Sequence, residues 1–560
     1  MKKITKGIFL LFTSIVPSVA SSCANNEGFY VANFENFMSP NLLSNLENNK
    51  YSSTLNLNNT ETEIGINNVS FRTFSTNEDL ERNFHTNYDV AIPTAYLVAK
   101  WANRGQLSLI DWSKFNLYKL NKYGNRTNEK IQTATDALTL FTPQARSILL
   151  SYDLSEAYAR DNIDSNNNYG GLLNYCVPYF LQDTKYAYKS KDNANLFPNS
   201  SYTWTQFLPE LKNKINNRDV TKIASQNDFR FLYSMSRLSE TDGATVNQTI
   251  ETNQLKTFNE NINRSEYEKS YINFVENLPK NTFYLNTDSN NVLNEFASLT
   301  GSDSILSYNG DILYSAQGGD NYAYDEENPS AFKNWISHFI QQDDITIKVV
   351  QTTSSLYLLD CMVINKSKVS NNQEKENKAY ALIKKIALEG LDQSLYQADD
   401  KSQYNNSNNS SSHPIFSQGE DEYLYGPMEN FSYVLYTPPS LTLNAYVLNS
   451  ASSFSTYNTE SYTGVENAGM SNSSNLSSIS DTLSESLKGN GFFTNIYNKS
   501  SMMSSNIFTN DQQYNNYINL LISIYQLTKK ISVNEIQTNI SDLNKSNMGW
   551  AFLDVQSKYF

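Results

Sequence analysis

Short apolar runs alternate with helical patterns over the first hundred residues. Residues 29–32, 69–74 and 88–92 are rich in β-branched and aromatic side chains and predict three strands. Residues 75–78 (STNE) read as a capping box that opens a helix, and residues 95–104 predict another helix. Strands that alternate with helices predict βαβ units, a buried parallel sheet and a ligand site at the carboxyl ends of the strands.

The same alternation continues through the middle of the chain. Strands are predicted at 175–180, 185–188, 304–308, 345–350 and 357–364, and helices at 204–211, 229–238 and 378–388. Near the carboxyl end, residues 517–525 place Leu520, Leu521 and Ile524 on one helical face, which is typical of a helix packed against the core.

Three polar segments interrupt this order. Residues 126–168 are weakly patterned, residues 402–412 are almost entirely Ser and Asn, and residues 451–486 are rich in Ser, Asn and Thr. Such compositions cannot bury enough apolar surface to form a core. We therefore expect surface loops or disordered insertions in these places.

The amino terminus has the pattern of a targeting signal. Three lysines precede a mostly apolar stretch at 8–19, and small residues then lead to Cys23. This order predicts a secretory signal peptide over residues 1–22, because the stretch is short for a transmembrane helix. A cysteine directly after it predicts a bacterial lipobox, in which the acylated Cys23 anchors the chain to the outer face of the cell membrane. An ordinary signal peptide followed by a chance cysteine is the alternative.

Composition narrows the function classes. The chain has 560 residues, enough for two domains, and 43 Lys and Arg against 57 Asp and Glu give a net charge of −14. That charge disfavours nucleic acid and favours cationic ligands. Three histidines and three cysteines without ligand spacing argue against a metal site. Because no phosphate-binding loop, dinucleotide fingerprint or nucleophile elbow occurs, we predict a binding protein without a cofactor rather than an enzyme.

Several short motifs follow one another in a fixed order. They are residues 29–37 (FYVANFENF), 88–96 (YDVAIPTAY), 177–179 (VPY), 204–208 (WTQFL), 228–230 (DFR), 308–310 (YNG), 357–364 (YLLDCMVI) and 436–439 (YTPP). In this order the chain resembles the bacterial spermidine/putrescine-binding proteins of ABC importers, in the version seen as mollicute lipoproteins. The collinearity across residues 29–450 carries the resemblance.

The resemblance implies a fold and a set of partners. The fold is α/β and periplasmic-binding-protein-like (type II), with two α/β lobes joined by a hinge and a ligand cleft between them. Residues 23–176 and 360–450 are expected to form the first lobe, and residues 177–359 and 451–560 the second. The resemblance also implies a monomeric receptor that binds a polyamine, spermidine or putrescine, and delivers it to an ABC permease and its ATPase.

Matched position by position, the resemblance assigns a ligand site. A polyamine carries ammonium groups on a methylene chain, and carboxylates and aromatic faces complement both. The matched positions are Phe34, Glu35, Phe37, Thr94, Tyr96, Asp228, Tyr308, Asp360 and Tyr436. The resemblance makes Asp228 and Asp360 the expected ammonium ligands. Asp360 stands out, since a carboxylate buried within an apolar strand needs a cation or several hydrogen bonds. A structural salt bridge or a helix cap is the alternative for Asp360, and core packing is the alternative for the aromatic residues.

Three positions depart from the family pattern. Asn36 and Phe231 stand where the family has acids, and Leu358 stands where it has an indole. The number of recognised ammonium groups is therefore open. Two further alternatives remain: another small cationic or organic ligand on the same fold, or a surface or adhesion lipoprotein that has lost transport.

The remaining cysteines flank the predicted lobe crossings. If Cys23 is lipidated, Cys176 and Cys361 are the only other thiols. Because one lies at each crossing, we expect them to be near neighbours, either as a disulfide or as buried free thiols.

Overall fold

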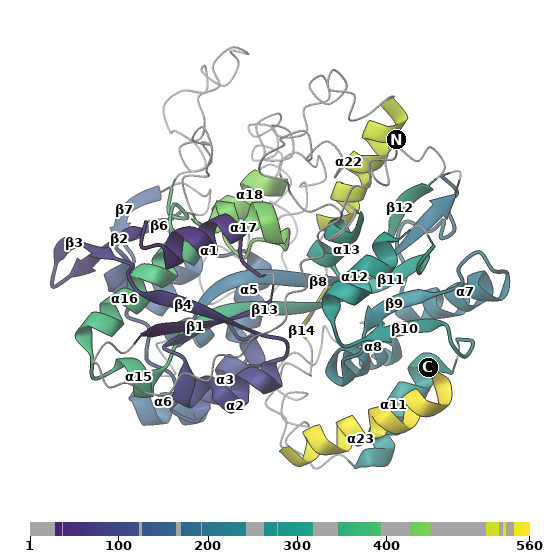
Figure 1. Ribbon diagram of the computed structural model, residues 1–560, viewed down its shortest axis with the longest axis horizontal. Coiled ribbons are helices and arrows are strands. Elements are labelled where there is room, and N and C mark those ends of the chain that lie inside the picture. Colours follow the sequence, from purple (N-terminus) through teal and green to yellow (C-terminus); the bar gives the residue numbers. More distant parts are fainter. Residues whose placement is uncertain are drawn as a thin grey trace, which may run out of the picture.

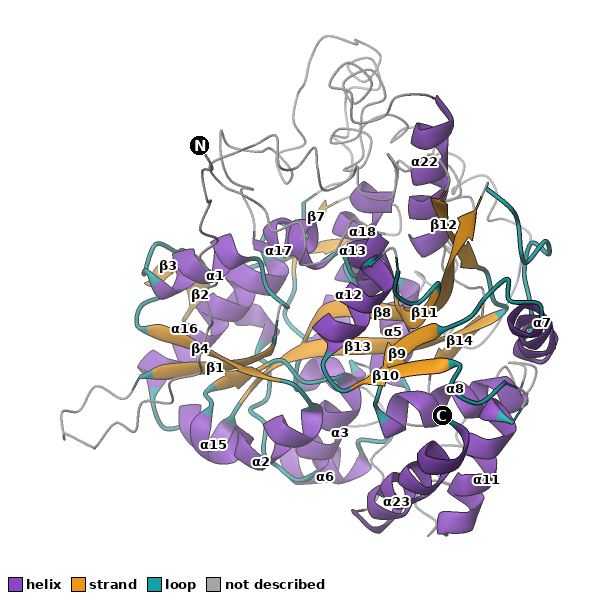
Figure 2. Cartoon of the chain, turned by 45° about the vertical axis from the view of Figure 1, so that its right-hand side comes forward, coloured by secondary structure: helices purple, strands orange, loops and turns teal. Residues whose placement is uncertain are grey.

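A ten-stranded mixed sheet runs through the molecule, and helices cover both of its faces (Figures 1 and 2). Its strands lie in the order β10-β9-β11-β8-β13-β5-β1-β4, with β12 paired to β8 and β14 paired to β13. The computed structural model describes residues 28–35, 37–121, 126–163, 170–191, 193–241, 263–276, 278–298, 300–316, 345–393, 426–448, 511–525, 530–533 and 542–560. Across these ranges, no helix is long and apolar enough to cross a membrane.

Some predictions fall on other parts of the chain. The signal peptide with Cys23, the position Asn36 and the polar segments 402–412 and 451–486 lie outside the described residues.

The elements around one end of the sheet form what we call the β1 half, on the left of Figure 1. Strand β1 (Phe29–Phe34) pairs in parallel with β4 (Val69–Phe74) and β5 (Val90–Ala91), as the alternation of strands and helices predicts. The other strands form two hairpins, β2 (Ser52–Leu57) with β3 (Thr60–Gly65) and β6 (Tyr118–Leu120) with β7 (Arg126–Lys130). The helical elements are α1 (Pro40–Glu47), α2 (Asn77–Asn87), α3 (Ala95–Asn103), η1 (Trp112–Phe115), α4 (Ala134–Ala137), η2 (Leu138–Leu140), α5 (Pro143–Leu150), α6 (Ser155–Asp161), η3 (Gly171–Asn174), α15 (Lys366–Val369), α16 (Gln373–Ile383), η5 (Lys384–Leu388), α17 (Gly426–Val434) and α18 (Leu441–Leu448).

The elements around the other end form the β9 half, on the right of Figure 1. Strand β9 (Ile223–Gln226) lies in parallel between β10 (Phe283–Asn286) and β11 (Ser304–Tyr308). The remaining elements are β12 (Ile345–Val350), α7 (Trp204–Asn216), α8 (Phe229–Thr241), α11 (Arg264–Val275), α12 (Ser289–Ala297), α13 (Asn309–Ala316), α22 (Asp511–Tyr525) and α23 (Asp542–Tyr559). Helix α22 packs on β12 and α13, and α23 packs on α11 and α8, so the last helices cover this half.

Two long strands connect the halves. Strand β8 (Val177–Lys191) pairs first with β13 (Ser354–Ile364) and then with β11 and β12, whereas β13 ends beside β5. Strand β14 (Lys530–Val533) pairs with the beginning of β13. The predicted α/β class is confirmed, and the predicted parallel pairing holds within each half, but the sheet as a whole is mixed, because both crossing strands run antiparallel to their neighbours on the main path of the sheet. The predicted lobe boundaries fall at the start of β8 and inside β13.

Strand β8 is continuous where the sequence predicts two strands. Its polar middle, residues 182–185 (QDTK), breaks the apolar pattern, yet all four side chains are buried. Lys185 Nζ lies 2.8 Å from Asp183 Oδ2, and the Ser355 hydroxyl of β13 donates a hydrogen bond to Asp183. The ion pair and the hydrogen bond offset part of the cost of burying Asp183, although burial still raises its pKa.

The prediction of a loop or disorder at 126–168 is wrong for the described part, residues 126–163. This stretch forms β7 and four short helical elements, and it buries Ile131, Phe141, Ile148 and Leu149. Because its helices last only one or two turns, their apolar residues produce no extended periodic pattern.

Candidate functional site

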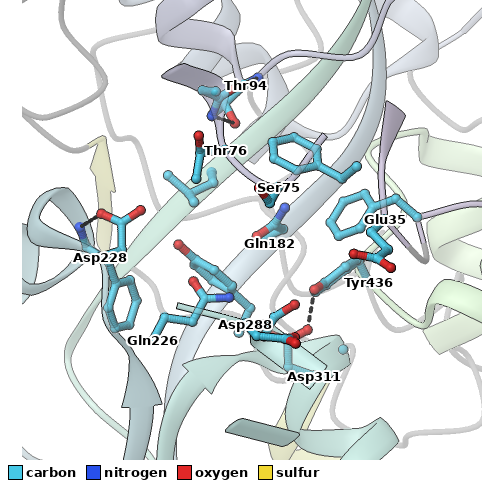
Figure 3. A pocket seen from close by; sticks show the side chains of 18 of the residues that line it. Glu35, Ser75, Thr76, Thr94, Gln182, Gln226, Asp228, Asp288, Asp311 and Tyr436 are labelled. Atoms are coloured by element: carbon cyan, nitrogen blue, oxygen red, sulfur yellow. Dashed lines mark hydrogen bonds between the residues drawn. The ribbon is translucent and has the colours of Figure 1, made fainter. Parts of the chain in front are cut away.

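A cavity of about 490 Å³ lies between the β1 half and the β9 half (Figure 3). Its walls come from the ends of β1 and β4, the starts of α2 and α3, the β9–α8 and β11–α13 connections, the start of α12, both crossing strands and the end of α17. Carboxyl ends of parallel strands thus meet here from both halves, as the sequence predicts. Of the predicted site residues, the structure brings eight to this cavity: Phe34, Glu35, Phe37, Thr94, Tyr96, Asp228, Tyr308 and Tyr436. The departing positions Phe231 and Leu358 line it as well.

Aromatic rings form a continuous wall on one side of the cavity. The ring centroids of Phe34 and Phe37 lie 5.3 Å apart, and those of Phe37 and Tyr436 lie 5.0 Å apart. The Tyr179 hydroxyl of β8 donates a hydrogen bond to the Phe37 carbonyl at 2.5 Å and holds this segment in place. Phe74, which the sequence analysis does not assign to the site, extends the wall with its ring centroid 4.3 Å from that of Phe34.

Asp311 is a carboxylate of the cavity that the sequence analysis does not identify. The Tyr436 hydroxyl donates a hydrogen bond to its Oδ1, and the Ser307 hydroxyl donates to its Oδ2 at 2.7 Å. Asp311 is only 8% exposed, and burial raises its pKa despite these two hydrogen bonds. Among the described residues, no Lys or Arg forms an ion pair with Asp311. The sequence did offer one indication that Asp311 belongs to the site, because this residue closely follows the carboxyl end of the strand predicted at 304–308.

Gly310 allows Tyr436 to approach Asp311. A Cβ atom at position 310 would lie 2.6 Å from Cδ1 of Tyr436. Asn309 Nδ2 donates to Thr437 Oγ1 at 2.9 Å, so the start of α13 is bonded directly to the segment that carries Tyr436. The YNG motif therefore provides close packing as well as the aromatic Tyr308.

Asp360 does not line the cavity, in contrast to its prediction as a direct ammonium ligand. Its side chain is fully buried one layer behind the wall, where it accepts hydrogen bonds from Thr94 Oγ1 at 2.9 Å and from Gln182 Nε2 at 2.5 Å. Burial raises the pKa of Asp360 to about 7. Because Thr94 and Gln182 do line the cavity, Asp360 orients two polar wall residues rather than facing the cavity itself.

Asp228 lies across the cavity from Asp311 and Tyr436 (Figure 3). Its Oδ1 accepts hydrogen bonds from the backbone N–H groups of Arg230 at 2.7 Å and Phe231 at 3.0 Å, so it caps α8 while lining the cavity. Burial and the negative charge of Glu78 raise the pKa of Asp228.

An internal ion pair occupies the same side of the cavity as Asp228. Arg230 Nε lies 3.0 Å from Glu78 Oε1, and the guanidinium carbon is 4.7 Å from the ring centroid of Tyr96. Lys545 of α23 also contacts Glu78, with Nζ 3.2 Å from Oε1. Burial alone would raise the pKa of Glu78, but the charges of Arg230 and Lys545 outweigh it and lower that pKa.

The sequence analysis missed Glu78 because it places this residue in a capping box. The structure corrects the box: the cap is Thr76, whose Oγ1 accepts a hydrogen bond from the backbone N–H of Asp79 at 3.2 Å, and Ser75 is not the cap. This shift by one residue leaves the Glu78 side chain free to reach Arg230.

Cys176 and Cys361 are buried neighbours, which confirms the expected proximity. Both are free thiols. Burial raises the pKa of the Cys361 thiol well above its usual value, and the hydrogen bond with the Cys176 thiol acts in the same direction. No group of three or more His, Cys, Asp or Glu side chains within the described ranges is arranged to hold a metal ion.

Comparisons with known proteins decide the family. A family model described as a hypothetical lipoprotein of the MG045 family matches residues 1–559. The chain belongs to this lipoprotein family. A search of curated protein sequences gives no significant match to the chain.

Solved structures show weaker likenesses to this lipoprotein. The spermidine/putrescine ABC transporter substrate-binding protein PotD from Streptococcus pneumoniae shares 13% identity over 88% of this chain and 99% of that chain, with a TM-score of 0.37. The TpPotD lipoprotein of Treponema pallidum shares 14% identity over 63% and 80%, with a TM-score of 0.36. The GacH receptor of Streptomyces glaucescens, solved unliganded and with acarbose, shares 9% identity over 86% and 99%, with a TM-score of 0.37. Since these scores are low, the fold described above rests on its own strand pairing.

Proposed function

We propose that the chain is an extracytoplasmic solute-binding receptor that holds a small organic cation of the polyamine type between its halves and delivers it to an ABC permease with its ATPase. In this proposal Cys23 carries the lipid that anchors the protein to the outer face of the cell membrane. The protein acts by binding and release rather than by catalysis. Membership of a lipoprotein family supports the anchor.

The composition of the cavity wall is the observation that carries the proposal. Five carboxylates line it: Glu35, Glu78, Asp228, Asp288 and Asp311. Nine aromatic residues line it with them: Phe34, Phe37, Phe74, Tyr96, Phe231, Tyr308, Tyr314, Tyr433 and Tyr436. Arg230 is the one cationic residue among the described lining residues. Carboxylates attract an ammonium group, and aromatic faces contact both the ammonium and its methylenes, with about 0.5–2 kcal/mol for each cation–π contact.

Asp311 is the proposed principal ammonium ligand. It is buried, it is held by Tyr436 and Ser307, and its raised pKa indicates that a cation would stabilise its ionised form. Tyr436 contacts both Asp311 and Phe37, so an ammonium group at Asp311 would also meet the aromatic wall. Asp311 therefore takes the role of ammonium ligand that the sequence analysis gave to Asp360, because Asp360 lies behind the cavity wall.

Titration calorimetry with spermidine, putrescine and butylamine tests the proposal. Asp311→Asn keeps the shape of the side chain and removes its charge, and we expect it to weaken amine binding at least about tenfold, or ~1.4 kcal/mol. Glu374→Gln is the matched control, because the Glu374 side chain is 88% exposed and does not line the cavity. The proposal fails if no amine binds the unaltered chain, or if Asp311→Asn binds amines as tightly as the control does.

A further inference from the structure

The two sides of the cavity differ in charge balance. On the Arg230 side, the carboxylates Glu78 and Asp228 face two cations of the protein, Arg230 and Lys545. On the opposite side, Asp311 accepts hydrogen bonds from neutral groups among the described residues, namely the Ser307 and Tyr436 hydroxyls and the backbone of Tyr308, and Glu35 adds a further negative charge to the wall. Attraction for a ligand cation is therefore concentrated on the Asp311 side.

Arg230 occupies an aromatic position that a ligand ammonium would otherwise use. Its guanidinium carbon lies 4.7 Å from the ring centroid of Tyr96, within the range of a cation–π contact, and its Nε is paired with Glu78. The residue is only 8% exposed, so this contact is part of the packed wall. A second ammonium group at this side would meet a fixed positive charge at short range and low dielectric, which is repulsive.

We propose that Arg230 is a resident cation that sets specificity: it fills the Tyr96 side of the cavity, so that the receptor selects compact organic ligands with a single ammonium group bound at Asp311. This inference rests on the proposed receptor function and narrows its ligand from the polyamine class to amines with a single ammonium group. Arg230 excludes a second charge through electrostatic repulsion, while its ion pair with Glu78 keeps the guanidinium in place. Extended polyamines then bind less tightly than a monoamine of similar length.

The test compares three amines on the unaltered full chain and on Arg230→Met by titration calorimetry. Butylamine, putrescine and spermidine carry one, two and three amino groups. We expect the unaltered chain to bind butylamine at least as tightly as putrescine, and Arg230→Met to bind putrescine about tenfold more tightly without a comparable change for butylamine. The matched control is Arg82→Met, because the Arg82 side chain is 73% exposed, forms its ion pair with Asp79 and does not line the cavity.

A second variant keeps the test decisive if Arg230→Met does not fold. The double variant Glu78→Gln with Arg230→Met removes both members of the buried pair, and it should still bind putrescine more tightly than the unaltered chain, since Asp228 remains. Tighter binding of putrescine than of butylamine by the unaltered chain, or weaker putrescine binding after loss of Arg230, would overturn the inference and leave the proposed function standing. If none of the three amines binds the unaltered chain, both are overturned.

Discussion

The Tyr436 hydroxyl donates a hydrogen bond to the carboxylate of Asp311, 125 positions earlier in the chain. Tyr436 follows α17, which packs on α1 and η5 of the β1 half, whereas Asp311 belongs to α13 of the β9 half. The same tyrosine ring packs on Phe37. One side chain therefore joins both halves at the most negative side of the cavity, and the proposed ligand at Asp311 would also contact this junction.

Gly310→Ala should disturb this junction. The added methyl group would lie 2.6 Å from Cδ1 of Tyr436, so the ring must move away from Asp311. We expect amine binding to weaken about tenfold, or ~1.4 kcal/mol, in titration calorimetry. The control is Gly549→Ala in α23, where nothing lies within 4 Å of the new Cβ. Equal affinities of the two variants would contradict the role of Gly310.

Asp360 should make stability fall as pH rises. Burial raises its pKa from 3.8 to about 7, so the folded protein retains a proton that the unfolded chain releases between these two values. The free energy of unfolding should then decrease across this window by up to about 4 kcal/mol, and Asp360 should add little change above it. Asp360→Asn is neutral at every pH and should lack this component. Urea unfolding at pH 5 and pH 8 measures the difference, and parallel pH dependence of both proteins would contradict it.

Removing only one member of the buried Asp183–Lys185 ion pair in β8 should strongly destabilise the protein. Asp183→Asn leaves Lys185 as a buried charge without its carboxylate, and we expect a loss of about 3–5 kcal/mol in the free energy of unfolding. The double variant Asp183→Asn with Lys185→Met should lose less, because no uncompensated charge remains. For comparison, Glu374→Gln removes an exposed partner of Lys378 and should cost about 0–1 kcal/mol. A single variant as stable as this control would refute the coupling.

Acylation of Cys23 should be required for the protein to remain attached to the cell membrane. Cys23→Ala removes the predicted acylation site, and we expect the variant to appear in the culture medium while the unaltered chain fractionates with membranes. Labelling with a fatty-acid analogue should mark the unaltered chain alone. Cys176→Ala is the control, because this buried thiol lies in the folded body. Labelling that persists in Cys23→Ala would place the lipid elsewhere.

Strand bounds were predicted most accurately where the hydrophobic pattern is the same along the whole strand. The apolar runs of β4 and β12 predict these strands at their observed bounds, whereas β8 was divided because its buried ion pair reads as a polar break. Eight of the nine predicted site residues line the cavity, and seven of them sit at or shortly after strand ends, whereas Tyr436 follows α17. Glu78 and Arg230 could not be matched in this way: they lie 152 positions apart, and only the approach of the halves brings them together.

The crossing strands also determine how the cavity could change its width. Strands β8 and β13 are hydrogen-bonded to each other, so these two described links between the halves lie in one antiparallel ribbon. Sliding within such a ribbon would break its hydrogen bonds and turn buried side chains to the wrong face, but twisting and bending preserve the register. If the cavity opens by deformation of this ribbon, the movement is a rotation of one half against the other, and the width of the cavity then changes together with the angle between the outer surfaces.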